Sequence, residues 1–166
     1  MDHAAQPIIT LYELSNHILT LASGDLSDQD ARTRSRGGAG PSIAWTIGHL
    51  CHHKVQVLEL LGQPRQNPFA ATFEGAATDG QAYPPLADLV ASFSALNRDV
   101  CAALAGAGDR LHAPAPDAGP HGEKRLAETV LFLAWHEAYH LGGIAAIRRE
   151  QGRTAIADLA RGVKAA

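Results

Sequence analysis

The chain has 166 residues, of which 46% are hydrophobic and 19% are charged, and its formal net charge is −3. This length and composition predict one folded domain, residues 1–166, with a core that needs no disulfides, and they exclude a disordered chain. The slightly acidic balance argues against a nucleic-acid-binding protein.

Apolar residues recur at helical spacing in four long segments, and no segment alternates as a strand would. The first predicted helix covers residues 7–22, because Pro7 suits a first helical position and an apolar stripe follows it. That stripe consists of Ile8, Leu11, Leu14, Ile18 and Leu21. The polar residues 23–40, rich in Gly and Arg, are predicted to form a loop.

Pro41 and Ser42 open the second predicted helix, and Gly62 and Pro64 close it. Residues 63–85 form a long connection, the third helix covers residues 86–105, and residues 106–123 form a second long connection. The fourth helix covers residues 126–151, and a short tail helix covers residues 155–163. Four long helices, with long connections after the second and the third, predict an all-α four-helix bundle. Connections of this length often border a functional site.

Two histidines of the fourth helix, His136 and His140, are four residues apart, so their side chains stack on one face. The same stripe contains core-type residues, namely Phe132, Leu133, Gly143, Ile144 and Ile147. Stacked imidazoles that face the core can bind one metal ion. The alternative is two core histidines that bond to their neighbours, but two in one apolar stripe are hard to satisfy without a metal.

Residues 136–140, His-Glu-Ala-Tyr-His, also match the H-E-x-x-H motif of zinc metalloproteases, in which Glu137 would be the general base. The longer protease pattern fails, because Ala146 stands where a third histidine would be and no strand precedes the motif. Glu137 lies about 100° round the helix from His136, so a surface charge or a hydrogen-bond acceptor beside the site is equally expected. A protease is therefore the less favoured interpretation.

The second helix carries a polar stripe through Ser42, Thr46, His49, His53 and Gln56. This stripe is either the solvated face of a bundle helix or a polar wall that faces the fourth helix. In the second case it would supply a third metal ligand. The spacing does not distinguish His49 from His53 as that ligand.

Two segments, PSIAWTIGHLCHH at residues 41–53 and HEAYHLGGIAAIRREQG at residues 136–152, resemble the DinB superfamily of metal-binding four-helix bundles, the DinB/YfiT-like proteins. The resemblance implies that one histidine of the second helix and two of the fourth bind a divalent metal. By position these are His49, His136 and His140. His52 and His53 lie outside the family pattern.

Three neutral imidazoles leave an open position on the ion, as in catalytic zinc sites. We expect zinc first and nickel next, since imidazole suits both. Such an ion lowers the pKa of bound water or of a bound thiol, so hydrolysis and thiol transfer both fit. The resemblance favours transfer of a low-molecular-weight thiol. A metal-binding stress or interaction module without turnover is the alternative.

Around this site the candidate catalytic residues are Glu137 and His53, and the candidate cofactor contacts are Trp45, Tyr139 and Arg148. Arg148 could bind an acidic group of a thiol, but we favour a role at the helix C-terminus, facing water.

The expected partners are a small-molecule substrate and a second copy of the chain, in a homodimer. No apolar run approaches the ~20 residues that span a bilayer, so we expect no membrane contact. The start of the chain lacks the positive charge of a signal peptide. The whole chain has only two cysteines, so we expect a cytoplasmic location.

Overall fold

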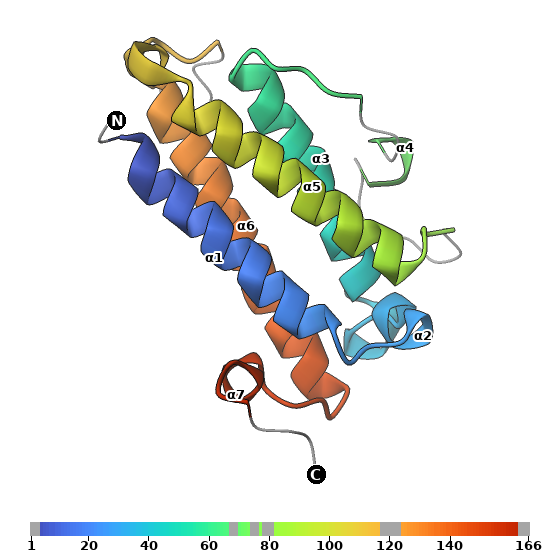
Figure 1. Ribbon diagram of the computed structural model, residues 1–166. Coiled ribbons are helices and arrows are strands. Elements are labelled where there is room, and N and C mark those ends of the chain that lie inside the picture. The colour runs from blue at the N-terminus through green and yellow to red at the C-terminus, as the bar shows by residue number, and fades with distance from the viewer. Residues whose placement is uncertain (1–3, 67–69, 74–76, 78–81, 117–123, 163–166) are drawn as a thin grey trace.

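The computed structural model describes residues 4–66, 70–73, 77, 82–116 and 124–162. The described residues are all-α, and four of their helices are long (Figure 1). These are α1 (Ala5–Ser23), α3 (Ile43–Leu60), α5 (Leu86–Ala105) and α6 (Leu126–Glu150). The predicted fold class is confirmed, and the four long helices lie close to their predicted bounds.

Each long helix packs against two others. α1 contacts α5 and α6, and α3 contacts the same two helices from the opposite side of the bundle. α1 and α6 run in one direction, and α3 and α5 run in the other (Figure 1). The connection from α3 to α5, which carries α4 (Ala70–Phe73), therefore returns along the bundle to the end where α3 begins. α3 and α6 are antiparallel neighbours, and they carry the predicted ligands.

The apolar core is divided into two clusters by a layer of polar residues. One cluster includes Leu19, Ile47 and Phe93, and the other includes Leu58 and Leu104. On α3, α5 and α6 the positions between the two clusters hold Lys54, Asn97 and Glu137, and all three side chains are buried. Buried charges of this kind need partners, because an unpaired charge in the core is strongly destabilising.

The predicted loop at residues 23–40 is partly wrong, because it contains α2 (Asp28–Arg32) and a 3-10 helix (Arg36–Gly38). A capping box starts α2: the Ser27 hydroxyl accepts from the Asp30 amide at 3.2 Å, and the Asp30 carboxylate accepts from the Ser27 amide at 2.9 Å. The Ser-x-x-Asp signal is present in the sequence, but a five-residue helix is too short to show an apolar period.

A second 3-10 helix, Gly108–His112, lies in the connection after α5, and the predicted tail helix is α7 (Ile156–Ala160). The last residue of the predicted tail helix, residue 163, is outside the described residues. The same holds for residues 67–69, 74–76, 78–81 and 117–123 of the two long connections.

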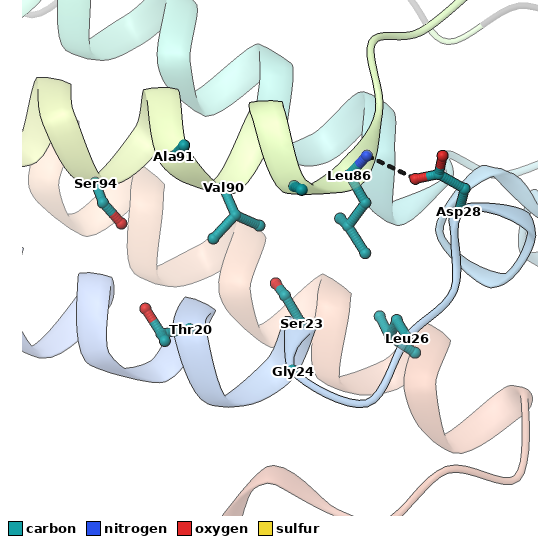
Figure 2. Close-up of a pocket in the computed structure, with 10 residues that line it drawn as sticks. Thr20, Ser23, Gly24, Leu26, Asp28, Leu86, Val90, Ala91 and Ser94 are labelled. Atoms are coloured by element: carbon teal, nitrogen blue, oxygen red, sulfur yellow. Dashed lines mark hydrogen bonds between the residues drawn. The ribbon is translucent and has the colours of Figure 1, made fainter.

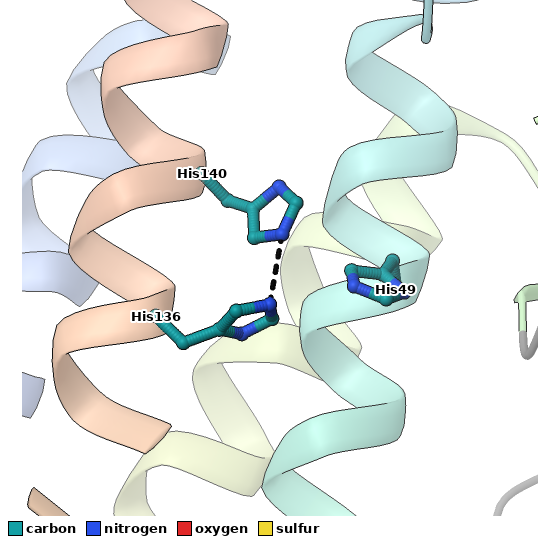
Figure 3. A group of neighbouring side chains, drawn as sticks. All are labelled: His49, His136 and His140. Atoms are coloured by element: carbon teal, nitrogen blue, oxygen red, sulfur yellow. Dashed lines mark hydrogen bonds between the residues drawn. The ribbon is translucent and has the colours of Figure 1, made fainter. Parts of the chain in front are cut away.

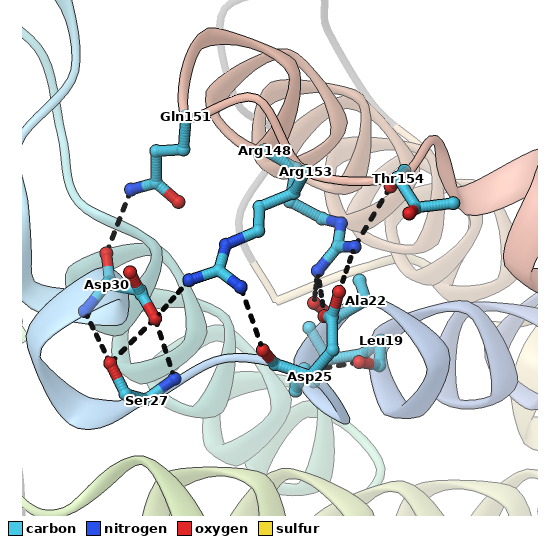
Figure 4. Close-up of polar contacts among 10 residues, drawn as sticks. Leu19, Ala22, Asp25, Ser27, Asp30, Arg148, Gln151, Arg153 and Thr154 are labelled. Atoms are coloured by element: carbon cyan, nitrogen blue, oxygen red, sulfur yellow. Dashed lines mark hydrogen bonds and ion pairs between the residues drawn. The ribbon is translucent and has the colours of Figure 1, made fainter. Parts of the chain in front are cut away.

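The C-terminal end of α6 is held to α1 by Arg148, whose side chain is fully buried (Figure 4). Its two terminal nitrogens donate to the Asp25 carboxylate at 2.5 and 3.0 Å, and to the carbonyl oxygens of Ala22 and Thr154 at 2.6 and 2.9 Å. These hydrogen bonds lower the pKa of Asp25. The expectation that Arg148 faces water or contacts a cofactor is therefore wrong, because its terminal donors are engaged inside the protein.

By length and composition alone, α6 is able to cross a membrane, with a mean hydropathy of 1.2 over its best window. The expectation that no segment is long and apolar enough is thus corrected. Core helices of soluble proteins pass the same test, so it is weak support for a membrane span. In the bundle, one face of α6 packs against α1 and α3.

Candidate metal centre

Three histidines from two helices point into one space between α3 and α6 (Figure 3). One ring nitrogen each of His49, His136 and His140 lies within 4.8 Å of the other two, and the Nε2 atoms of His136 and His140 are 3.0 Å apart. Around a tetrahedral zinc ion with Zn–N bonds of about 2.0–2.1 Å, neighbouring nitrogens are about 3.4 Å apart. The three imidazoles therefore fit a single divalent ion after small side-chain movements.

The local sequence explains how His49 is held. Ser42 caps α3 by accepting from the Trp45 amide at 3.1 Å, and the Trp45 ring stacks on His49 with centroids 4.7 Å apart. His49 also donates from Nδ1 to the Phe73 carbonyl oxygen at 3.3 Å, which leaves its Nε2 free to bind an ion. The predicted place of Trp45 beside the site agrees with this packing.

Phe73 reaches His49 because α3 has a glycine at position 48. A Cβ atom at Gly48 would overlap the Phe73 ring, which is fully buried against α3. Phe73, in the connection after α3, therefore contributes directly to the orientation of a candidate metal ligand.

Burial lowers the pKa values of all three histidines, because a charged imidazole loses hydration. The pKa of His140 falls to about 4, since the charges of His136 and His49 add to the effect of burial. The imidazoles are therefore neutral near pH 7, and the neutral form is the one that binds metal.

The polar stripe of α3 faces α6 and not the solvent. Ser42 and Thr46 are buried, and His53 is half-buried, with its Nε2 3.2 Å from that of His49. Burial and the charges of His49 and His136 lower the pKa of His53 to about 4. Of the two interpretations of this stripe, the polar wall is the one that agrees with the structure.

Glu137 does not face the histidines, although it follows His136 directly in the chain. Its side chain is 4% exposed, and its Oε2 lies 2.8 Å from Nζ of Lys54, which is itself 1% exposed. Burial raises the pKa of Glu137, and the Lys54 charge opposes that rise. The expectations of a general base, a surface charge and an acceptor beside the metal are corrected, because the carboxylate is bound to a core cation.

The partner of Glu137 was missed by sequence reasoning. Lys54 donates to Asn97 Oδ1 at 2.6 Å, and its ammonium lies over the rings of Tyr12 and Phe93, at 4.5 and 4.3 Å from their centroids. A signal was available, since Lys54 interrupts the apolar face of α3 between Leu50 and Val57–Leu58. A single lysine in such a face indicates a buried counter-charge on another helix.

A cavity of about 300 Å³ lies beside His140, which forms part of its wall. Thr46, Tyr139 and Arg36 also line it, and the Tyr139 ring lies 5.4 Å from that of His140. Arg36 has a backbone φ of +53°, which residues other than glycine rarely adopt. Its amide donates a hydrogen bond to Glu150 Oε1 at 2.8 Å. Tyr139 thus lines this cavity next to His140, one of the three candidate ligands.

A larger cavity, of about 550 Å³, lies between α1 and α5 on the other side of the bundle (Figure 2). Apolar and small residues such as Leu26, Val90 and Ala91 line most of it. Its carboxylate, Asp28, accepts a hydrogen bond from the amide of Leu86 at 2.7 Å and so helps to start α5. The histidine cluster, and not this cavity, brings together groups that can do chemistry.

The family comparison agrees with the geometry. A sequence model of the DinB superfamily matches residues 12–144, a range that contains His49, His136 and His140. No curated protein matches the chain with significance. Because the family match covers most of the chain and all three candidate ligands, the chain belongs to the DinB superfamily.

Proposed function

We propose that this protein is a metal-dependent enzyme that acts on a small molecule, with zinc as the first candidate ion and nickel as the second. The observation that carries the proposal is the convergence of three neutral imidazoles beside a cavity of about 300 Å³. Three protein ligands leave a position for water or a thiol on the ion. A bound ion would supply Lewis-acid chemistry, by lowering the pKa of that water or thiol.

The residues of the cavity would hold and orient the substrate. Tyr139 offers an exposed ring and hydroxyl, and Arg36 offers a positive charge that suits a carboxylate. Thr46 donates its hydroxyl proton to the Ser42 carbonyl at 2.8 Å, so its oxygen presents an acceptor toward the cavity. These groups fit a small polar molecule such as an acidic low-molecular-weight thiol.

Of the two reactions that fit, transfer of a low-molecular-weight thiol is favoured over hydrolysis by family analogy. The test is turnover of an aryl halide by the zinc-loaded protein with a panel of thiols, and of an aryl ester without thiol. Activity that needs the thiol supports the transferase, and activity without it supports the hydrolase. Both should disappear on chelation and in His140→Ala. Absence of turnover in every combination would overturn the proposal that the protein is an enzyme.

The second candidate is a metal-binding module without catalysis. The binding of Glu137 to Lys54 favours it, since the strongest candidate base of the sequence is removed from the site. This candidate predicts one equivalent of bound metal without turnover in the assays above.

We also propose a homodimer, because Phe132, Trp135 and Tyr139 are exposed by 51%, 56% and 66% along one face of α6. The exposure of Phe132 differs from its expected place in the core. Contiguous exposed apolar residues are common at protein interfaces. Light scattering on the purified chain, with Trp135→Glu as the comparison, tests this pairing.

A further inference from the structure

A fourth histidine lies against the three candidate ligands. His53 follows His49 by one turn of α3, and the Nε2 atoms of the two are 3.2 Å apart. Its ring centroid is 4.5 Å from that of His136 on α6. The set of three nitrogens that lie within 4.8 Å of one another does not include His53, so its imidazole would have to move toward the ion to bind it.

The partners at Nδ1 favour one tautomer for each of these two histidines of α3. The Phe73 carbonyl oxygen, 3.3 Å from Nδ1 of His49, can only accept, so this Nδ1 carries the proton. The same reasoning applies to Nδ1 of His53, which is 2.8 Å from Gln56 Oε1. In the amide orientation of the structure, Oε1 of Gln56 faces Nδ1 of His53, and its amide nitrogen lies 3.0 Å from Nε2 of His52.

Two lone pairs consequently face each other. A neutral imidazole has one N–H, so the Nε2 atoms of His49 and His53 both present lone pairs across 3.2 Å. In these tautomers the contact is repulsive without a cation between the two nitrogens, whereas in the other tautomer of His53 its Nε2–H donates to Nε2 of His49. The spacing is also close to the ~3.4 Å between neighbouring ligands of a tetrahedral zinc ion. On α6, His136 and His140 form a second pair with their Nε2 atoms 3.0 Å apart.

We propose that His53 is a fourth nitrogen ligand of the ion held by His49, His136 and His140. The proposal rests on the metal site of the proposed function but not on turnover. A fourth imidazole closes the ion to solvent in the resting protein. An incoming thiol or water must then displace His53 or raise the coordination number, and this requirement would make the site selective for strong ligands.

The first experiment looks for a signal that only a direct ligand can give. His53→Cys and His52→Cys proteins are loaded with Co²⁺, and their absorption spectra are compared with that of the wild type. If position 53 is in the coordination shell, His53→Cys gains a sulfur-to-cobalt charge-transfer band in the near ultraviolet, and His52→Cys does not. Bound cobalt without this band in His53→Cys would overturn the proposal.

The second experiment measures what the imidazole contributes. Competition with a chromophoric chelator should show at least about tenfold weaker zinc binding in His53→Ala. The matched control is His17→Ala, an exposed histidine of α1, which should bind zinc as the wild type does. Circular dichroism verifies that both variants are folded. Equal zinc affinity in the wild type and His53→Ala would also overturn the fourth ligand.

The results separate this proposal from the proposed enzyme. A charge-transfer band in a protein without turnover supports the fourth ligand and overturns the enzyme. If the wild type turns over substrate but the His53→Cys variant binds cobalt without the band, the enzyme is supported and the fourth ligand is overturned. A wild-type protein that binds neither cobalt nor zinc would overturn both.

Discussion

His136 and Glu137 are neighbours in the chain, yet they belong to two regions of the bundle with opposite physical character. His136 faces α3 in a half-exposed cluster of neutral imidazoles whose pKa values are lowered. Glu137 faces a fully buried cation, Lys54, that also contacts α5 and α1. The side chains that define the two regions are about 100° apart around the axis of α6. From this difference we infer that the histidine cluster serves binding, whereas the lysine–glutamate pair serves the stability of the bundle.

Removal of the buried cation should have the largest effect. Lys54→Met leaves Glu137 as an unpaired charge in the core, and we expect it to lower the free energy of unfolding by about 3–5 kcal/mol. Urea denaturation measures this loss. The double variant Lys54→Met/Glu137→Leu should be more stable than Lys54→Met alone, since it removes the orphaned charge. A double variant that is less stable than the single one would contradict the assignment of this pair.

Metal loading should act through the other region. An ion that binds only the folded state stabilises it by about 2.7 kcal/mol when its free concentration is 100 times Kd. We expect the melting temperature to rise with added zinc, and to rise clearly less in His136→Ala than in the wild type. Elemental analysis should find about one equivalent in the wild type. Equal thermal responses in the two proteins would place the zinc somewhere else.

Acid should destabilise the metal-free protein through the histidine cluster. The pKa values of His53 and His140 are about 4 in the folded state, against an ordinary value of 6.5. Between these values the unfolded chain binds protons that the folded protein does not, so the free energy of unfolding falls as the pH drops from 6.5 toward 4. Denaturation midpoints at pH 7 and pH 5 measure this fall. His140→Gln should weaken the dependence, and an unchanged dependence would assign it to other groups.

The smallest effect is expected for Glu137→Gln on metal affinity. Since Glu137 is bound to Lys54 on the core side of α6, its neutralisation should leave the zinc Kd within about twofold of the wild type, measured where the variant is folded. A metalloprotease-like arrangement, with the carboxylate beside the ion, predicts a clear change. A large shift in Kd would therefore restore Glu137 to the site.

Local spacing was sufficient for the long helices and for the two candidate ligands of α6. The i, i+4 pair His136 and His140 shares a helix face whatever the fold, and the family pattern selected His49. The short helix α2 was missed, because its signal is a cap and not an apolar period.

Contacts between residues far apart in the chain were not predictable in the same way. Arg148 lies in the last turn of α6, where a solvated cation is the ordinary outcome, but Asp25 and two carbonyl groups from other segments surround it. Similarly, the pairing of Lys54 with Glu137 depends on how α3 and α6 face each other. Helical periodicity does not contain this information.

Gly48 links the long connection to the chemistry of the site. Its missing side chain allows Phe73 to lie against α3, where the Phe73 carbonyl orients His49. If the position of Phe73 against α3 raises the affinity of the site for an ion, then a bound ion must stabilise that position of Phe73 by the same free energy. The position of Phe73 and ion binding at His49 are thus energetically coupled. A methyl group at position 48 would displace Phe73 and free the His49 ring to rotate, so we expect Gly48→Ala to bind zinc more weakly although no candidate ligand is replaced.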